Sequence, residues 1–206
     1  MKRNFQLFRF CLITLFASLF FACAPDKQTE NIYTIAFTVR DAPSVFTTVT
    51  HGGPHMIVTA FIFDSLVWKD ENDFVPLLAE SWNASDDKKT YTFNLRPNAR
   101  WHDGRSFTAD DVKFTYDYIR VNPFPFSASE ANNAIETVEA TNPQTVVFHL
   151  KDSAPDFIVN VAAQIQIIPK YIWQDVKDPL KFQEPSAFVG TGAFKFVETR
   201  RGEVVK

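Results

Sequence analysis

Apolar and polar residues alternate in several short stretches of this chain, and such alternation predicts β-strands. In residues 89–96 the side chains of Tyr91, Phe93 and Leu95 are separated by polar neighbours, and residues 145–150 repeat the pattern. A period of two directs apolar side chains to one face of a strand, so both stretches predict strands with one buried face. Three further stretches are predicted as strands, the first two of them buried: 32–39, 165–168 and 193–199.

Wider, helical spacing of apolar residues begins at residue 56 and continues to residue 68. This spacing predicts an amphipathic helix whose apolar face packs inward. The expected inward face consists of Ile57, Ala60, Phe61, Phe63 and Val67.

A second helix is predicted to begin after Thr108, because threonine is a favourable N-cap residue. Asp110 and Asp111 follow it, and acidic side chains stabilise the positive end of the helix dipole. Two shorter helices are predicted at 154–163 and 170–176. The buried stripe of the helix after Thr108 is expected to consist of Val112, Tyr116 and Ile119.

Glycines mark the points where the backbone must turn tightly or approach another segment. Residues 101–104 predict a tight turn in which Gly104 adopts a positive φ. Gly190 and Gly192 predict a close crossing of two backbone segments, since a glycine has no Cβ atom to keep them apart. A charged hairpin is expected around residues 200–202.

The first 22 residues have the layout of a secretory signal peptide. Lys2, Arg3 and Arg9 precede a short apolar run that ends at Ala22. A membrane span needs about 20 apolar residues, and this run is shorter. The alternative, a buried core helix, leaves the basic start unexplained. We therefore expect an exported protein.

Cysteine usage supports an anchored form of the exported chain. Cys11 would leave with the signal peptide, so the mature chain would keep only Cys23 and form no internal disulfide. Residues 20–23 resemble a lipobox, which implies acylation of Cys23, with residues 23–31 as a tether to the membrane. The alternative is a free thiol after ordinary signal cleavage.

Composition and charge narrow the class of partner. The chain has 206 residues, of which 46% are hydrophobic and 22% charged, as in ordinary globular proteins. Loss of the three basic residues of the leader would change the formal net charge from −3 to −6. An acidic chain without a basic patch is not expected to bind nucleic acid.

Four motifs occur in order over residues 76–112: PLLAESW, YTFNLR, WHDG and FTADDV. Together they resemble the signature block of bacterial extracellular solute-binding protein family 5. The stretches 168–170 (IPK) and 189–194 (VGTGAF) resemble the return from the family's peripheral subdomain. The resemblance implies an α/β fold with a mixed (α+β) sheet, arranged as an incomplete lobe of a type II periplasmic binding protein.

The resemblance also implies a domain organisation and a function. Residues 32–55 and 185–206 would form core strands of the main lobe, and residues 56–184 its peripheral subdomain. Members of the family capture peptides, oligosaccharides or nickel chelates outside the membrane and deliver them to an ABC permease, without a cofactor. Because members are longer than this chain, the alternative is a truncated gene fragment or a recruited interaction domain without transport function.

Ligands of α/β sheets bind outside the carboxyl ends of strands, which points to the loop after residues 32–39. We expect Asp41 to anchor a ligand amine or hydroxyl group and Ser44 to hydrogen-bond the ligand. The full set of predicted ligand-binding residues is Arg40, Asp41, Ser44, Phe124, Phe126 and Gln164.

Two alternative functions, metal binding and hydrolysis, have weaker support in the sequence. His51 and His55 flank a Gly-Gly-Pro turn without a third nearby ligand, so a loop role is favoured over a metal site. His102 precedes Asp103, but no serine of the chain stands in a nucleophile-elbow motif. We therefore expect a binding protein and not an enzyme, with no metal and no cofactor.

Overall fold

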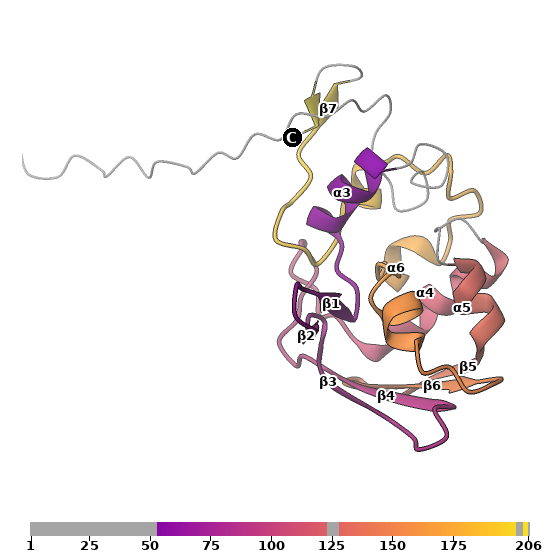
Figure 1. Ribbon diagram of the computed structural model, residues 1–206. Coiled ribbons are helices and arrows are strands. Elements are labelled where there is room, and N and C mark those ends of the chain that lie inside the picture. The colour runs from indigo at the N-terminus through magenta and orange to yellow at the C-terminus, as the bar shows by residue number, and fades with distance from the viewer. Residues whose placement is uncertain (1–52, 123–127, 201–203, 206) are drawn as a thin grey trace, which may run out of the picture. The chain divides into compact units, whose positions relative to one another are not determined.

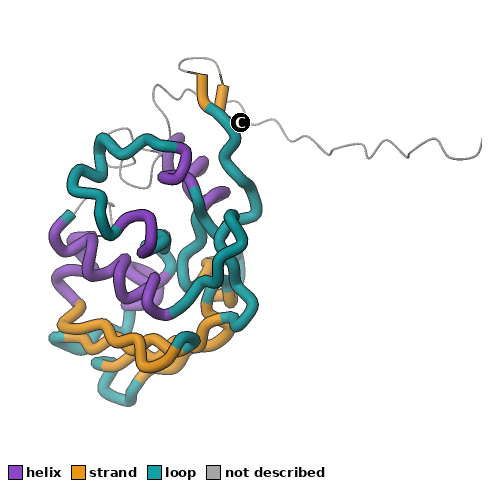
Figure 2. Tube along the Cα trace, turned by 180° about the vertical axis from the view of Figure 1, so that it is seen from behind, coloured by secondary structure: helices purple, strands orange, loops and turns teal. Residues whose placement is uncertain are grey.

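A four-stranded antiparallel sheet forms the largest layer of the structure, with strand order β3-β4-β6-β5 (Figure 1). The structure, a computed structural model, describes residues 53–122, 128–200 and 204–205. Helices α4, α5 and α6 lie on one face of this sheet, and the view from behind in Figure 2 shows the same two layers. The four strands are β3 (Ala79–Ala84), β4 (Thr90–Leu95), β5 (Ile135–Asn142) and β6 (Thr145–Leu150).

The strands predicted at 89–96 and 145–150 are confirmed as β4 and β6. Tyr91, Phe93 and Leu95 are buried on the helix side, and the residues between them are more exposed. The turn that joins β3 to β4 suits its sequence, because the Asp87 carboxylate accepts a hydrogen bond from the Lys89 backbone N–H at 3.0 Å. Lys88 takes a positive φ of 56° within this turn.

Helix α4 (Ala109–Val121) begins after Thr108, as predicted. The Asp111 carboxylate accepts a hydrogen bond from the Thr108 backbone N–H at 3.0 Å, which satisfies one of the free donors at the helix start. The predicted stripe of Val112, Tyr116 and Ile119 is buried against the sheet.

Aromatic rings fill the space between α4 and the sheet. Phe148 of β6 lies at the centre, with its ring centroid 5.5 Å from that of Phe93 and 4.8 Å from that of Tyr116. Phe157 contacts the same ring at 5.3 Å. Phe148 and Phe93 are fully buried, and we call this group of packed residues the sheet core.

A second apolar cluster is built from helices and loops instead of strands. It contains Val58 and Ile62 of α3, Tyr118 of α4, Trp173 of α6 and Phe188 of η3. The helices of the structure besides α4 are α3 (Gly53–Ile62), α5 (Ala128–Ala134), α6 (Lys170–Trp173) and the short helices η2 (Ile158–Ala162) and η3 (Pro185–Phe188). The remaining strands are β1 (Val67–Lys69), β2 (Phe74–Pro76), β7 (Thr199–Arg200) and β8 (Val204–Val205).

The helix predicted at 56–68 was wrong in its limits and in its buried face. It begins at Gly53 and ends at Ile62, and Val67 belongs to strand β1. Val58 and Ile62 are buried, whereas Ile57 and Phe61 are 49% and 37% exposed. Helix α3 carries apolar side chains on both its buried and its exposed sides, so the spacing of apolar residues alone does not identify the side that packs.

The strands predicted at 165–168 and 193–199 were also wrong. Ile165, Ile167 and Ile168 are buried as expected, but their segment joins no sheet. Of the second stretch only Thr199 lies in a strand, the short β7. It pairs antiparallel with β8, which agrees with the predicted hairpin. Both segments make backbone hydrogen bonds to groups outside strands, described below.

The helix predicted at 154–163 is confirmed in part by the five-residue η2, and that at 170–176 by α6. Strand β5, helix α5 and the β1–β2 hairpin were not predicted. Every strand pairing among the described residues is antiparallel. The strand predicted at 32–39 lies outside the described residues. The proposed division at residues 56 and 184 stays a prediction. No helix within the described ranges has the length and hydropathy to span a membrane.

Candidate functional site

Gln164 is the one predicted ligand-binding residue that the structure describes. It lies on the surface in the turn after η2, and its side-chain amide donates to the Val159 carbonyl at 3.2 Å. The other predicted residues, together with the expected lipidation site, lie outside the described residues: Arg40, Asp41, Ser44, Phe124, Phe126 and Cys23. Their roles stay predictions.

Residues of the WHDG and VGTGAF motifs meet at the end of α3. Residues 190–194 pass across the last turn of this helix, and we call this contact the crossing. The Gly192 N–H donates to the Ile62 carbonyl at 2.8 Å, and the Phe194 N–H donates to the Phe61 carbonyl at 3.1 Å. The last carbonyls of a helix lack partners within it, so the crossing caps α3 from a distant part of the chain.

Both glycines of the crossing are required by the space available. A Cβ atom on Gly190 would overlap the carbonyl oxygen of Ile62. On Gly192 it would overlap the carbonyl oxygen of Phe61. The prediction of a close backbone crossing at these residues is confirmed. In the WHDG turn, Gly104 has the predicted positive φ, 90°.

His102 fastens the crossing to the WHDG turn. Its backbone N–H donates to the Gly190 carbonyl at 2.8 Å. Its ring uses both nitrogens, because the Gly190 N–H donates to Nδ1 at 3.2 Å and Nε2 lies 2.8 Å from the Gly192 carbonyl oxygen. An amide N–H only donates and a carbonyl only accepts, so this geometry assigns the neutral tautomer with its proton on Nε2.

Asp64 lies beside this contact, half-buried in the segment that follows α3. Its backbone N–H donates to Thr191 Oγ1 at 3.4 Å, and its carbonyl accepts from the Ile167 N–H at 2.9 Å. Burial raises the pKa of the Asp64 carboxyl, while the Thr191 hydroxyl and the nearby His102 ring oppose that rise.

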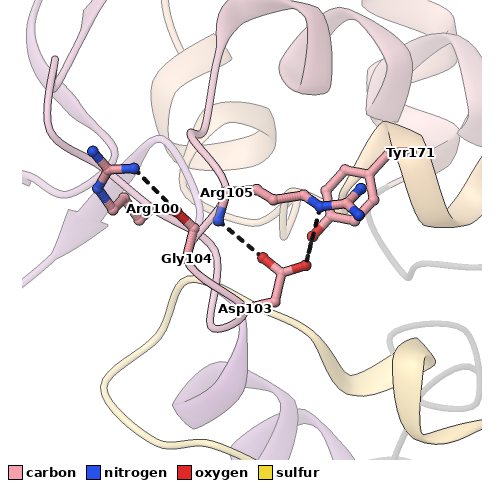
Figure 3. A network of polar contacts seen from close by, with 5 residues as sticks. All are labelled: Arg100, Asp103, Gly104, Arg105 and Tyr171. Atoms are coloured by element: carbon pink, nitrogen blue, oxygen red, sulfur yellow. Dashed lines mark hydrogen bonds and ion pairs between the residues drawn. The ribbon is translucent and has the colours of Figure 1, made fainter.

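Asp103 connects the WHDG turn to α6 (Figure 3). Its carboxylate accepts from the Tyr171 hydroxyl at 2.6 Å and from the Arg105 backbone N–H at 3.1 Å. The Arg105 guanidinium stacks over the Tyr171 ring, 4.1 Å from its centroid. Burial acts to raise the pKa of Asp103, but the hydrogen bonds from Tyr171 and Arg105 outweigh it and lower that pKa.

The FTADDV and IPK motifs meet in the same way. The buried carboxylate of Asp111 accepts from the Lys170 backbone N–H at 3.0 Å, and the Thr115 hydroxyl accepts from the Ile168 N–H at 3.1 Å. Burial raises the pKa of Asp111, against the effect of the hydrogen bonds from Lys170 and Thr108. These two side chains of α4 therefore fix the start of α6.

The contacts among the WHDG turn, the crossing and the start of α6 are those of a structural scaffold. Both ring nitrogens of His102 bond to backbone groups, which leaves neither available to act as a general base. Within the described residues no group of three histidine, cysteine or acidic side chains is placed to hold a metal ion. Trp101 is buried, and Trp82 is half-buried beside the sheet core.

Sequence reasoning did not identify Asp64, Thr191 or Tyr171 as partners of the WHDG turn. Asp64 gave one usable signal, because it is a lone charge in an otherwise apolar and small run between Met56 and Trp68. Tyr171 gave none, since a tyrosine in a short helix is ordinary.

A family model confirms the resemblance. Residues 73–206 match the model described as bacterial extracellular solute-binding proteins, family 5 middle. The match includes the WHDG turn, α4 and the crossing segment.

Individual relatives agree with this match. A putative ABC transporter peptide-binding protein of Brucella ovis is 33% identical over 150 residues, which cover 70% of this chain and 28% of the relative. The oligopeptide-binding protein AppA of Bacillus subtilis is 30% identical over 151 residues, covering 70% of this chain and 27% of AppA. The chain thus spans little more than a quarter of these relatives.

A solved structure of related sequence shows the same fold. The crystal structure of NikZ from Campylobacter jejuni, in complex with Ni(L-His), has a TM-score of 0.60 and 35% sequence identity. The match covers 70% of this chain and 29% of NikZ.

Proposed function

The chain belongs to the bacterial extracellular solute-binding proteins of family 5, and we propose that it contributes part of one lobe of a receptor that captures peptides. The receptor would hold its peptide outside the membrane and deliver it to an ABC permease. The family match over residues 73–206 carries this proposal. The peptide is chosen because the Brucella and Bacillus relatives are both named for peptides.

The described residues support a scaffold role within this receptor. The WHDG turn, the crossing and the start of α6 are joined by hydrogen bonds between segments far apart in the chain. Such a rigid wall can present a binding loop without changing shape itself. The loop of residues 40–44 is the proposed ligand-contacting element, and Asp41 its anchor for the peptide amine.

Thermal unfolding of the 206-residue chain with candidate ligands tests the proposal. Di-, tri- and oligopeptides at about 100 times their Kd would stabilise the chain by about 2.7 kcal/mol. Ni(L-His) and oligosaccharides are tested in parallel, because NikZ was solved with the nickel complex. A shift with either of these alone would replace the peptide, and no shift with any class would remove the proposal.

The loop assignment is tested by a matched pair of substitutions. Asp41→Asn removes the proposed anchor charge, and we expect it to abolish most of the peptide-induced shift. Asp86→Asn makes the same chemical change in the exposed turn between β3 and β4 and should leave the shift intact. Equal shifts in both variants would contradict a role for Asp41.

Export and anchoring belong to the same proposal. A signal peptide of residues 1–22 and acylation at Cys23 would place the receptor on the outer side of a membrane. Growth with a labelled fatty acid would label the wild-type chain and not the Cys23→Ala variant. Equal labelling of the two chains would exclude Cys23 as the acylation site.

A further inference from the structure

The His102 ring makes two contacts, and one of them depends on its protonation state. Nδ1 accepts a hydrogen bond from the Gly190 N–H, which requires an unprotonated nitrogen. An imidazolium carries protons on both nitrogens and cannot accept this bond. The second contact, from Nε2 to the Gly192 carbonyl, survives in either state.

We propose that His102 is a pH-sensitive latch, whose protonation breaks the bond from Gly190 and loosens the crossing from the end of α3. This proposal rests on the geometry of the crossing and does not depend on the proposed function. The crossing offers no room for adjustment, because Gly190 already lies against the Ile62 carbonyl. An added proton on Nδ1 would face the Gly190 N–H, so the two groups must separate.

Charged groups lie near the latch. Asp64, from the segment after α3, interacts electrostatically with His102. Asp103 and Arg105 lie in the same turn as His102, but they pair with each other and with Tyr171 of α6. The crossing itself contributes the uncharged Thr191. The Gly190 bond favours the closed latch.

Release of the latch has a local structural consequence. The bonds from Gly192 and Phe194 to the end of α3 depend on the path of the same few residues. A free crossing would expose the last carbonyls of α3 to water. We expect the change to stay local, because the sheet core shares no hydrogen bond with His102 among those described.

Nuclear magnetic resonance of the isotopically labelled, intact chain tests the latch in two ways. The ring spectrum at about pH 8 should show His102 with its proton on Nε2. Between about pH 8 and about pH 5, the window in which histidines titrate, the Gly190 amide should lose protection from hydrogen exchange about five- to tenfold, after correction for intrinsic rates. A proton on Nδ1 at high pH, or constant protection, would overturn the proposal without any variant.

Two histidine variants assign the effect to His102. His102→Gln cannot titrate, so the pH dependence at Gly190 should disappear. His149→Gln is the matched control, because His149 lies on β6 near Glu139 and away from the crossing, and it should keep the wild-type dependence. If His102→Gln also kept that dependence, another group would be the switch.

Discussion

In the sheet core, buried and exposed positions follow the two-residue period of the strands, whereas at the crossing they follow no period. Strand β6 buries Val146, Phe148 and Leu150 and leaves the residues between them half-exposed. At the crossing, Gly190 is buried while Phe194 is 48% exposed. The two regions also differ in the contacts that hold their segments together. Packed aromatic rings do so in the sheet core, and backbone hydrogen bonds do so at the crossing.

This difference separates two ways to stabilise a lobe. The sheet core is stabilised by the removal of apolar area from water. This stabilisation is large, and it tolerates replacement of one side chain by another of similar size. The crossing gains little from burial, and its bonds require particular residues because no Cβ atom fits at its glycines. At the crossing, where the WHDG and VGTGAF motifs meet, one added atom decides whether the segments fit together.

The largest effect should come from emptying the sheet core. Phe148→Ala removes a fully buried ring that contacts three others, and we expect a loss of about 3–5 kcal/mol in the free energy of unfolding. Val147→Ala, on the opposite face of the same strand, is the control and should cost less than half as much. Urea unfolding measures both variants, and equal losses would show that β6 is not packed as described.

A smaller but sharper effect is expected at the crossing. Gly190→Ala adds one methyl group against the Ile62 carbonyl, and overpacking of this kind costs about 1–3 kcal/mol. Gly104→Ala is the matched control, because its Cβ would have open space and only the positive φ would penalise it, by about 1 kcal/mol. If Gly104→Ala proved the more damaging change, the close approach would not be what limits the crossing.

The same contrast explains what the sequence could predict. The strands at 89–96 and 145–150 and the helix after Thr108 were predicted well, because a regular period exposes one face. Strand β5 was missed because two irregularities, next to Ile135 and next to Ala140, interrupt its alternation. The stretch 165–168 was buried as predicted but wrongly assigned to a strand, since its N–H groups bond to the Asp64 carbonyl and the Thr115 hydroxyl.

The candidate site, too, was predicted only in part. Glycine spacing predicted the crossing, because the absence of a side chain is itself a signal of close approach. The partners of His102 and Asp64 were not predicted, since these contacts join residues 90 and 127 positions apart in the chain. Contacts of that kind leave no periodic trace, and they need the fold before they can be identified.

Asp111 links α4 to the start of α6, and its ionisation gives a pH test. Because its pKa is raised in the folded chain, the folded state holds this proton more tightly than the unfolded state, whose value is near 3.8. Its contribution to the free energy of unfolding should therefore decline as pH rises above 3.8 and then level off. Asp111→Asn should abolish this decline, measured as the difference between the two chains in urea from about pH 4 to about pH 7.

The sign of the pH dependence decides the outcome of that comparison. If wild type became more stable relative to Asp111→Asn as pH rose, the hydrogen bonds from Lys170 and Thr108 would outweigh burial. The exposed Asp178, whose pKa is lowered by its bond to Lys181, supplies the control variant Asp178→Asn with the opposite expected slope.

The smallest effect should follow from cutting the tie between the WHDG turn and α6. Tyr171→Phe removes the hydroxyl that donates to Asp103 but keeps the ring under Arg105, so the loss should be at most about 1 kcal/mol. The pKa of Asp103 should rise at the same time, because one of the bonds that lower it is gone. Tyr91→Phe is the control, because the Tyr91 hydroxyl donates to the Ala154 carbonyl and should not affect the Asp103 carboxyl. Carboxyl chemical shifts measured against pH distinguish the cases: an unchanged Asp103 in Tyr171→Phe would mean that Arg105 alone holds its charge, and the turn would then be fastened to α6 by stacking instead of by the hydrogen bond.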